Sequence, residues 1–219
     1  MKCTIGLVLS LIMLLAGSQV AHATTTILLG CDVGTYGEID YNGMNDSGKI
    51  EGNLISLTYV KKVKIVITNQ FGEFYGNNGK EHLEFFDIQA GYPVVNDKSG
   101  ILYLTLTGFD YSGYLNYYTP YLTRHEADGC LAGFEMVGFP TDKTQFEFGW
   151  HRSIGGSYRL NYNNSSLGLT ILKLKVQYLL TYNLGLVISC QLKDFNNKDA
   201  TVNFSEKINT AAIGLIYRL

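Results

Sequence analysis

Apolar and polar residues alternate with a period of two along most of this 219-residue chain. Residues 172–178 place Leu, Leu, Val and Tyr at even positions and Lys, Lys and Gln at odd positions, and residues 146–150 place Phe, Phe and Trp at even positions. Because successive side chains of a strand point to opposite faces, each segment predicts a strand with one apolar and one polar face. No window sustains the period of an amphipathic helix. The sequence therefore predicts an all-β fold.

Turn residues such as Asn, Asp, Gly and Ser separate the alternating segments and define the order of the expected strands. We expect strands at about 26–36, 50–60, 63–73, 83–94, 100–110, 129–139, 144–154, 167–180, 184–194 and 208–219. Short turns are expected at 61–62, 96–99, 141–143 and 181–183, and longer polar links at 41–48, 74–82, 111–128, 155–166 and 196–207. This alternation is typical of a single antiparallel up-and-down transmembrane β-barrel, with short periplasmic turns and longer external loops. Ten strands is the expected count, and eight is the alternative.

A soluble β-sandwich has the same period, because it buries the apolar face that a membrane barrel turns toward lipid. Charged residues make up only 16% of the chain, whereas soluble domains contain about 25%. Aromatic residues make up 13%, and several fall near the ends of expected strands, where an interfacial girdle requires them. The expected girdle contains Tyr36, Tyr59, Phe71, Tyr92, Phe139, Trp150, Tyr178 and Tyr217. Composition and placement therefore favour the membrane barrel.

Residues 1–23 have the organisation of a secretory signal peptide. Lys2 precedes an apolar run over 5–16, and small and polar residues then lead to an A-x-A cleavage site at 21–23. We therefore expect residues 24–219 to form one exported barrel domain in the outer membrane. The formal net charge is −2 and no basic stripe is present, which excludes nucleic acid as a partner.

The last expected strand has the pattern of an insertion signal. Apolar residues alternate to the end of the chain, with Gly214, Tyr217 and the final Leu219 in the places expected for the C-terminal signal of outer-membrane barrels. Together with the signal peptide and the alternating loop lengths, this chain resembles the small outer-membrane barrels of the OmpA/OmpX type. Their signals usually end in Phe or Tyr, so Leu219 is a departure. The resemblance implies outer-membrane lipid and the barrel insertion machinery as partners.

The polar faces of the expected strands carry both acids and bases, which a barrel turns into its lumen. The expected lumen charges are Asp32, Lys64, Asp87, Glu135, Glu147, Lys173, Lys175, Lys193 and Arg218. Charges withdrawn from water need partners, and a barrel of about eight strands is just wide enough for side chains to fill. We therefore expect paired charges, a mostly plugged lumen and weak conductance. A wall of three adjacent basic strands, favouring anions in a narrow pore, is the alternative.

One local pattern raises the question of catalysis. His151 and Ser153 share a strand face, and the pair resembles the His-x-Ser of the lipid A 3-O-deacylases. Those enzymes continue with an Asn-Ala-Gly run and a nearby Glu, whereas this chain continues with Ile154, Gly155 and Gly156 and has no acid before Ser166. Because the orienting carboxylate is missing, we expect no catalytic residues. A lipid-acting enzyme that uses His151 and Ser153 is the minor alternative.

Two His-Glu neighbours fall in the expected links and could be taken for metal ligands. His82 follows Glu81, and His125 precedes Glu126, but neither pair has a third ligand at metal-binding spacing. We expect solvated loop residues, no metal and no cofactor. Past residue 23 the cysteines are odd in number and irregularly spaced, so no disulfide framework is expected.

The link at 111–128 is unusually rich in tyrosine, a side chain suited to recognition because it presents rigid apolar area with a polar tip. The tyrosines available for loop contact are Tyr111, Tyr114, Tyr117, Tyr118 and Tyr121. The sequence therefore predicts a barrel with a structural or surface-contact role through its external loops, with an unknown extracellular ligand as a further partner. A narrow pore and a lipid-acting enzyme remain alternatives.

Overall fold

The computed structural model describes residues 24–33, 35–41, 44–77, 79–117, 122–160, 163–198 and 203–219. The regular structure in this part of the chain consists of strands. No helix among these residues is long and apolar enough to cross a bilayer. The expected signal peptide, residues 1–23, lies outside the described residues.

The strands follow one another in the chain with short connections. Their bounds are β1 (Thr24–Asp32), β2 (Thr35–Tyr41), β3 (Met44–Val60), β4 (Lys64–Gly76), β5 (Gly79–Asn96), β6 (Gly100–Tyr117), β7 (Leu122–Thr141), β8 (Thr144–Leu160), β9 (Asn163–Ser166), β10 (Leu169–Leu179), β11 (Leu184–Lys198) and β12 (Asn203–Arg218).

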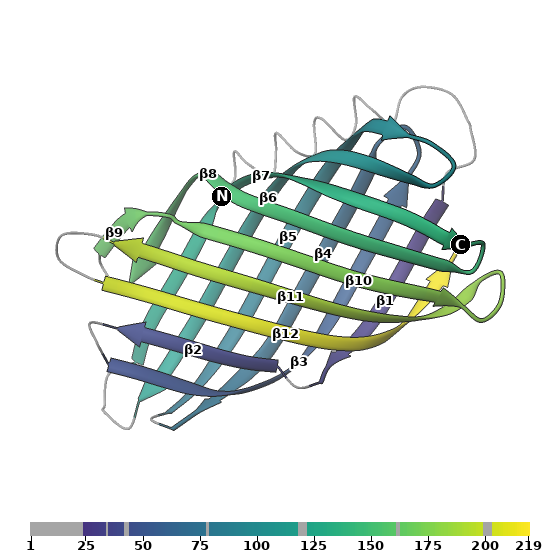
Figure 1. Ribbon diagram of the computed structural model, residues 1–219. Helices are drawn as coiled ribbons and strands as arrows, with labels where there is room; N and C mark the ends of the chain where they lie inside the picture. Colours follow the sequence, from purple (N-terminus) through teal and green to yellow (C-terminus); the bar gives the residue numbers. More distant parts are fainter. Residues whose placement is uncertain are drawn as a thin grey trace.

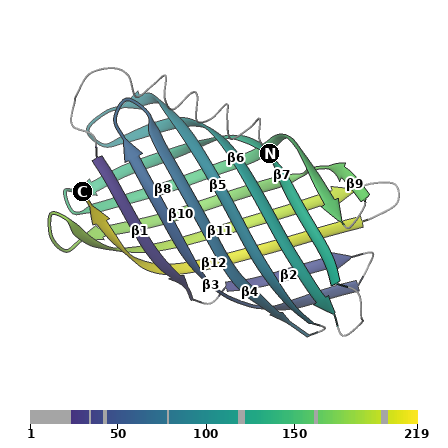
Figure 2. The ribbon, with the colours of Figure 1, turned by 180° about the vertical axis from the view of Figure 1, so that it is seen from behind.

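Antiparallel pairing closes these strands into a barrel. β1 pairs with β12 on one side and with β3 on the other, so the sheet has no free edge there. β2 pairs with the same two neighbours and continues β1, while β9 precedes β10 along the edge of β8. The wall therefore has ten strand positions, which confirms the expected all-β ten-stranded barrel and excludes the eight-stranded one. Figure 1 shows β8 and β10–β12 on the near wall, and Figure 2 shows β1 and β3–β6 on the opposite wall.

All ten expected strands are present, but the expected long links are wrong in extent. β6 and β7 continue their pairing through most of 111–128, with Gly113 opposite His125 and Asn116 opposite Leu122. The same extension occurs where β11 and β12 pair as far as Lys198 and Asn203. Glycine and polar residues in these segments indicated loops, yet pairing satisfies the backbone N–H and C=O groups whether the side chains are polar or not. The strands therefore project well beyond the connections that the sequence indicated.

The outward face of the wall carries an apolar band at the end with the short turns. Each stretch of wall contributes exposed apolar side chains to it: Leu29, Ile55, Leu104, Phe134, Leu174, Ile188 and Leu215 are examples. Exposed Tyr92, Phe139, Tyr178 and Tyr217 lie close to the short turns, as a girdle requires. Toward the other end the outward residues become polar, with Lys49, Glu84, Asp110, Glu126 and Lys207 as examples. An outward apolar band flanked by aromatics and polar residues is the arrangement of a membrane-spanning barrel, which excludes the sandwich.

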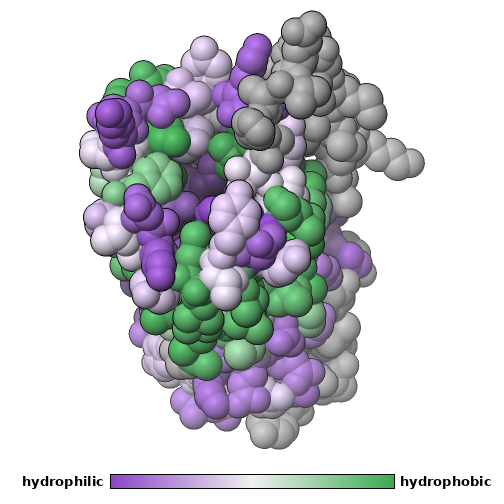
Figure 3. All heavy atoms as spheres, turned by 90° about the vertical axis from the view of Figure 1, so that its right-hand side faces the viewer, coloured by the Kyte–Doolittle hydropathy of each residue, from purple (hydrophilic) through white to green (hydrophobic). Residues whose placement is uncertain are grey.

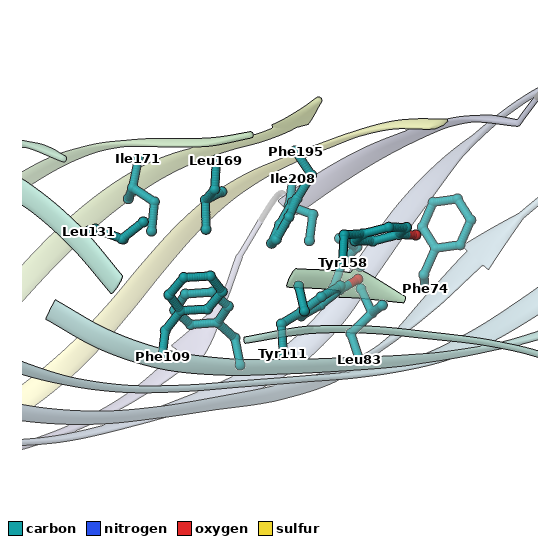
Figure 4. Packing of buried hydrophobic residues seen from close by; sticks show 13 residues of the cluster. Phe74, Leu83, Phe109, Tyr111, Leu131, Tyr158, Leu169, Ile171, Phe195 and Ile208 are labelled. Atoms are coloured by element: carbon teal, nitrogen blue, oxygen red, sulfur yellow. The ribbon is translucent and has the colours of Figure 1, made fainter. Parts of the chain in front are cut away.

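The interior has two levels. The level surrounded by the apolar band is largely polar, whereas the level nearer the projecting ends contains a cluster of buried apolar side chains. Figure 4 shows Leu169, Ile171, Phe195 and Ile208 from one wall facing Phe109 from the other. Phe85 and Phe109 stack at 5.6 Å between ring centroids. This apolar cluster fills the lumen across its width, which the sequence did not predict.

Replacing Leu215 with Arg tests the position of the apolar band. Leu215 is 52% exposed on the outward face of β12, and a charge there should destabilise the barrel by about 2–4 kcal/mol. The matched control is Asn209→Arg, on the same face above the band, with an expected cost of about 0–1 kcal/mol. Guanidinium unfolding in phospholipid vesicles, followed by the fluorescence of the single tryptophan, Trp150, measures both losses. Equal losses at the two positions would contradict the placement of the band.

Candidate functional site

A network of buried charges crosses the lumen within the apolar band. Lys64 of β4 contacts Glu135 of β7 and lies 3.0 Å from a carboxylate oxygen of Glu147 on β8. Glu147 also lies 3.0 Å from the amine of Lys175 on β10, and Gln89 of β5 donates a 2.5 Å hydrogen bond to Glu135. Lys64, Glu135, Glu147 and Gln89 are buried. Ion pairs between opposite charges therefore connect β4 with β7 and β8 across the lumen.

A second group of charges lies beside the first. The amine of Lys173 is 3.9 Å from Asp87, and Lys193 donates a hydrogen bond to the side-chain oxygen of Gln70. Gln70 in turn donates to Asp32 at 3.3 Å. The structure thus brings eight of the nine expected lumen charges into side-chain contact with a charged or amide partner. We call these eight residues with Gln70 and Gln89 the lumen charge network.

Arg218 is the expected lumen charge that the structure does not bring into this network. It is half-buried and lines a cavity of about 200 Å³ at the end of the barrel with the short turns, together with Thr58, Tyr103 and Gln177. Its side-chain Nε has no hydrogen-bond partner among the described residues. Figure 3 faces this end and shows a hollow with hydrophilic atoms in its depth and hydrophobic residues on the flank.

The three expected insertion-signal residues lie where β12 closes the barrel. Gly214 pairs with Gly30 of β1 and with Val187 of β11. Tyr217 and Leu219 are exposed, with Leu219 at the end of the chain. The backbone N–H of Leu219 donates a 2.9 Å hydrogen bond to Thr25, so these residues seal the seam between β1 and β12.

His151 and Ser153 share the inward face of β8 but make different contacts. The Ser153 hydroxyl donates to the backbone oxygen of Leu167 and accepts from the N–H of Leu169, each at 3.1 Å. These bonds span the interruption between β9 and β10. His151 is buried, and neither ring nitrogen has a hydrogen-bond partner in the described part of the chain. The hydroxyl is therefore engaged in wall structure, and no His-Ser hydrogen bond joins the pair.

A separate cluster, which we call the outer cluster, consists of Glu81, Tyr111, His125 and Glu206. These side chains come from β5, β6, β7 and β12 and all four are buried. Nε2 of His125 lies 2.5 Å from Oε1 of Glu81 and 4.0 Å from Oε2 of Glu206. The Tyr111 hydroxyl donates a 2.5 Å hydrogen bond to Oε1 of Glu206 and lies 3.1 Å from Nε2 of His125.

The expectation that His125 and Glu81 are solvated loop residues is wrong. Both lie on strands that extend past the apolar band, and on an extended strand every second side chain points into the lumen. His82 and Glu126, their neighbours in the chain, point outward: His82 is exposed and Glu126 is partly exposed. Tyr111 likewise points inward and is buried, so it does not belong to an external contact loop. The side chains of Tyr114 and Tyr117, and the whole of Tyr118 and Tyr121, lie outside the described residues.

The outer cluster lies above the membrane-spanning part of the wall, because its residues alternate with outward polar ones such as Lys80, Asp110 and Lys207. Burial lowers the pKa of His125, but the charge and hydrogen bond of Glu81 together with the charge of Glu206 reverse this and raise the pKa to about 9. Burial raises the pKa of Glu206 to about 7, although His125 opposes the shift. The cluster therefore concentrates acid and base groups in an enclosed place.

The signal for this cluster in the sequence is weak. On β5 the inward residues run Glu81, Leu83, Phe85, Asp87 and Gln89, so acids, amides and apolar groups share one face. Alternation alone does not distinguish Glu81, at the end of this face, from an acid that is exposed to solvent. Glu206 is remote in sequence and reaches the cluster only because β12 closes the barrel.

Comparisons with known proteins show the fold and no family. No family model matches the chain, and no curated protein matches it in sequence. The structure is similar to that of the outer membrane protease OmpT from Escherichia coli, with a TM-score of 0.59, 11% identity and coverage of 90% of this chain and 96% of that chain. Neisserial surface protein A has a TM-score of 0.47 and 12% identity, with 91% and 100% covered. The COG4313 outer membrane channel from Pseudomonas putida F1 has a TM-score of 0.47 and 11% identity, with 92% and 97% covered. The chain thus has the fold of an outer-membrane β-barrel.

Replacing Lys64 with Met tests the lumen charge network. The change leaves Glu135 without its cation and Glu147 with Lys175 alone, so the barrel should lose about 3–5 kcal/mol of stability. Adding Glu135→Gln should restore part of this loss, because the buried charge then disappears with its partner. The matched control is Lys49→Met, which removes an exposed 2.7 Å pair with Glu51 and should cost less than about 1 kcal/mol. Unfolding titrations measure each variant, and a loss at Lys64 no larger than that at Lys49 would refute the role of the network.

Proposed function

We propose that this protein is a non-enzymatic outer-membrane barrel, exported by a cleaved signal peptide, with a structural and surface-contact role of the kind that small barrels of the OmpA/OmpX type have. The observation that carries the proposal is the filled lumen. Ion pairs link β4 to β7 and β8 within the apolar band, and the apolar cluster spans the lumen above them. A barrel whose interior is used for wall-to-wall contacts presents its working surfaces on the outside.

The hydrogen bonds that Ser153 makes support the non-enzymatic part of this proposal. The Ser153 hydroxyl bonds to the backbone oxygen of Leu167 and the backbone N–H of Leu169, which occupies its one donor and one of its two acceptor positions. General-base activation requires a base within hydrogen-bond reach of the hydroxyl. A hydroxyl that already makes two hydrogen bonds to the barrel wall is a poor nucleophile.

A groove on the outside of the barrel supports the surface-contact part. It has a volume of about 770 Å³ and extends from Asp32, at the end of β1, over β3, β4 and β5, with Lys49, Glu73, Tyr75 and His82 also in its lining. The Tyr75 hydroxyl donates a 2.5 Å hydrogen bond to Glu73, whose carboxylate also lies 2.6 Å from the amine of Lys80. This polar and aromatic surface lies beyond the apolar band, where an extracellular ligand can reach it. Tyrosine in a polar setting suits recognition.

A narrow, weakly selective pore is the second candidate, favoured by the cavity of about 200 Å³ at the short-turn end, whose mixed lining includes Lys64, Glu147 and Lys175. A further cavity of about 20 Å³, lined by Gln70, Phe85, Tyr111 and Lys193, lies higher in the lumen. The lumen charge network and the apolar cluster occupy the space around these cavities. We therefore favour the filled barrel over the pore.

Planar-bilayer recording separates these two functions. The folded protein should give no current above background, because side chains from opposite walls meet in the lumen. A porin inserted in the same bilayer provides the positive control. Steady single-channel steps from the wild-type protein would exclude the filled lumen and favour the pore, and anion selectivity would then implicate the lysines of β10 and β11.

Replacing Tyr75 with Ser tests the groove. Folded wild-type protein and the variant are compared on an array of bacterial lipopolysaccharides, glycans and extracellular-matrix proteins. Binding to one class should fall at least about tenfold in the variant, because the groove loses its exposed aromatic surface. Tyr182→Ser is the matched control, since Tyr182 is 81% exposed in a short turn at the opposite end. Equal binding by both variants, or no binding by the wild type, would argue against contact through the groove.

A further inference from the structure

Three side chains of the outer cluster point their ligand-type atoms at a common place. One atom each from Glu81, His125 and Glu206 can be chosen so that all lie within 4.8 Å of one another. A tetrahedral ion with bonds of about 2.1 Å needs ligand atoms about 3.4 Å apart. The observed separations of 2.5 Å and 4.0 Å from Nε2 of His125 bracket that value. Small rotations of the two carboxylates are therefore enough to give metal-ligand geometry.

Each of the two carboxylates in this place has one oxygen without a hydrogen-bond donor among the described residues. Oε2 of Glu81 and Oε2 of Glu206 are buried and have no hydrogen-bond donor among the described residues. Their surroundings are apolar, because Phe74, Leu83 and Tyr158 belong to the adjoining apolar cluster. Burying a carboxylate without a compensating interaction is costly. Oε1 of Glu81 and Oε2 of Glu206 both face Nε2 of His125, so the cluster offers oxygen and nitrogen atoms with spare capacity to bind a cation.

The neighbouring strand also approaches this place closely. Gly113 of β6 pairs with His125, and a β-carbon on Gly113 would overlap both Nε2 of His125 and Oε1 of Glu81. Any other residue at this position would fill the space between these two ligand atoms. The glycine therefore allows the His125 imidazole and the Glu81 carboxylate to approach each other at this place.

The charge of the cluster also favours a bound cation. Two carboxylates place two formal negative charges inside an apolar enclosure. The next cation down the lumen, Lys193, donates to Gln70 and lies 4.2 Å above the ring of Phe85. A divalent ion bound by two carboxylates and a neutral imidazole leaves no net charge, which a buried site favours.

We propose that Glu81, His125 and Glu206 bind a divalent transition-metal ion, with Zn²⁺ as the best representative, inside the projecting end of the barrel. Zn²⁺ accepts imidazole nitrogen and carboxylate oxygen in a tetrahedral arrangement and leaves a fourth position for water. Purely oxygen-bound ions such as Ca²⁺ and Mg²⁺ need six or more oxygen ligands and do not match this set. The site is independent of the external groove and adds a metal-binding property to the proposed function.

Tyr111 is a positioning residue in this site. By donating to Oε1 of Glu206, its hydroxyl turns Oε2 of the same carboxylate toward His125. Groups that orient metal ligands in this way usually contribute about 10–100-fold to metal affinity. Tyr111 also packs against Phe195, with 4.7 Å between ring centroids, so the orientation is fixed by the apolar cluster.

The test uses the full folded barrel in detergent after dialysis against EDTA. Zn²⁺ is added, free ion is removed, and bound metal is counted by plasma mass spectrometry while a zinc-sensitive dye reports affinity. The wild type should bind one Zn²⁺ per chain. His125→Gln and Glu206→Gln should each lose at least about 100-fold in affinity, and Tyr111→Phe about 10–100-fold. The matched control, His82→Gln, changes an exposed histidine next to Glu81 and should bind as the wild type does.

Two further readouts keep the proposal testable if a variant fails to fold. Heat-dependent gel mobility of the wild type should shift to higher temperature with Zn²⁺, because a ligand that binds only the folded state stabilises it. Co²⁺ in place of Zn²⁺ should give visible ligand-field bands of a low-coordinate nitrogen and oxygen site. Failure of the wild type to retain Zn²⁺, or retention by His125→Gln and Glu206→Gln equal to that of the wild type, would overturn the site. The cluster would then be a proton-sharing group of acids and imidazole.

Discussion

Backbone hydrogen bonding in lipid is the constraint on which the rest of the structure depends. A bilayer offers no water to an unpaired N–H or C=O, so each crossing strand needs a partner on both sides. β1 meets this requirement by pairing with β12 and β3, and β2, from Thr35 onward, pairs with the same two strands. Closure fixes the count of ten strand positions, and the strand count in turn sets the width of the interior.

That width explains why charges and aromatic rings meet across the lumen. Side chains from opposite walls of a narrow barrel touch, so an inward lysine can reach an acid three or four strands away, as Lys64 reaches Glu135 and Glu147. A wider barrel would leave these groups in water, where their pairing would contribute little. Inside the apolar band they are withdrawn from water, and each needs its partner for the barrel to remain stable.

The fold and the inward charges could be predicted because both depend on local alternation. The phase of the pattern around Lys173 and Lys175 assigns them to the polar face, and the structure has both in the lumen. Partners across the lumen could not be predicted, since they depend on the tilt and stagger of the closed sheet. Gly, Asp and Tyr are frequent in the segment around His125, so the sequence indicates a loop there. The burial of His125 depends on pairing with Gly113, which only the extended hairpin provides.

The two ends of the wall also differ in which face is apolar. This difference determines where buried charges have counterions nearby. Within the lipid band the outward face is apolar and the lumen is polar, so charges such as Glu147 are matched by nearby lysines. Beyond the band the outward face meets water and the lumen carries the apolar cluster, as in a soluble barrel. Acids that remain inside at that level have few cations near them. Glu81 and Glu206 are in this position, so their need for a counterion follows from the same change of polarity that marks the membrane boundary.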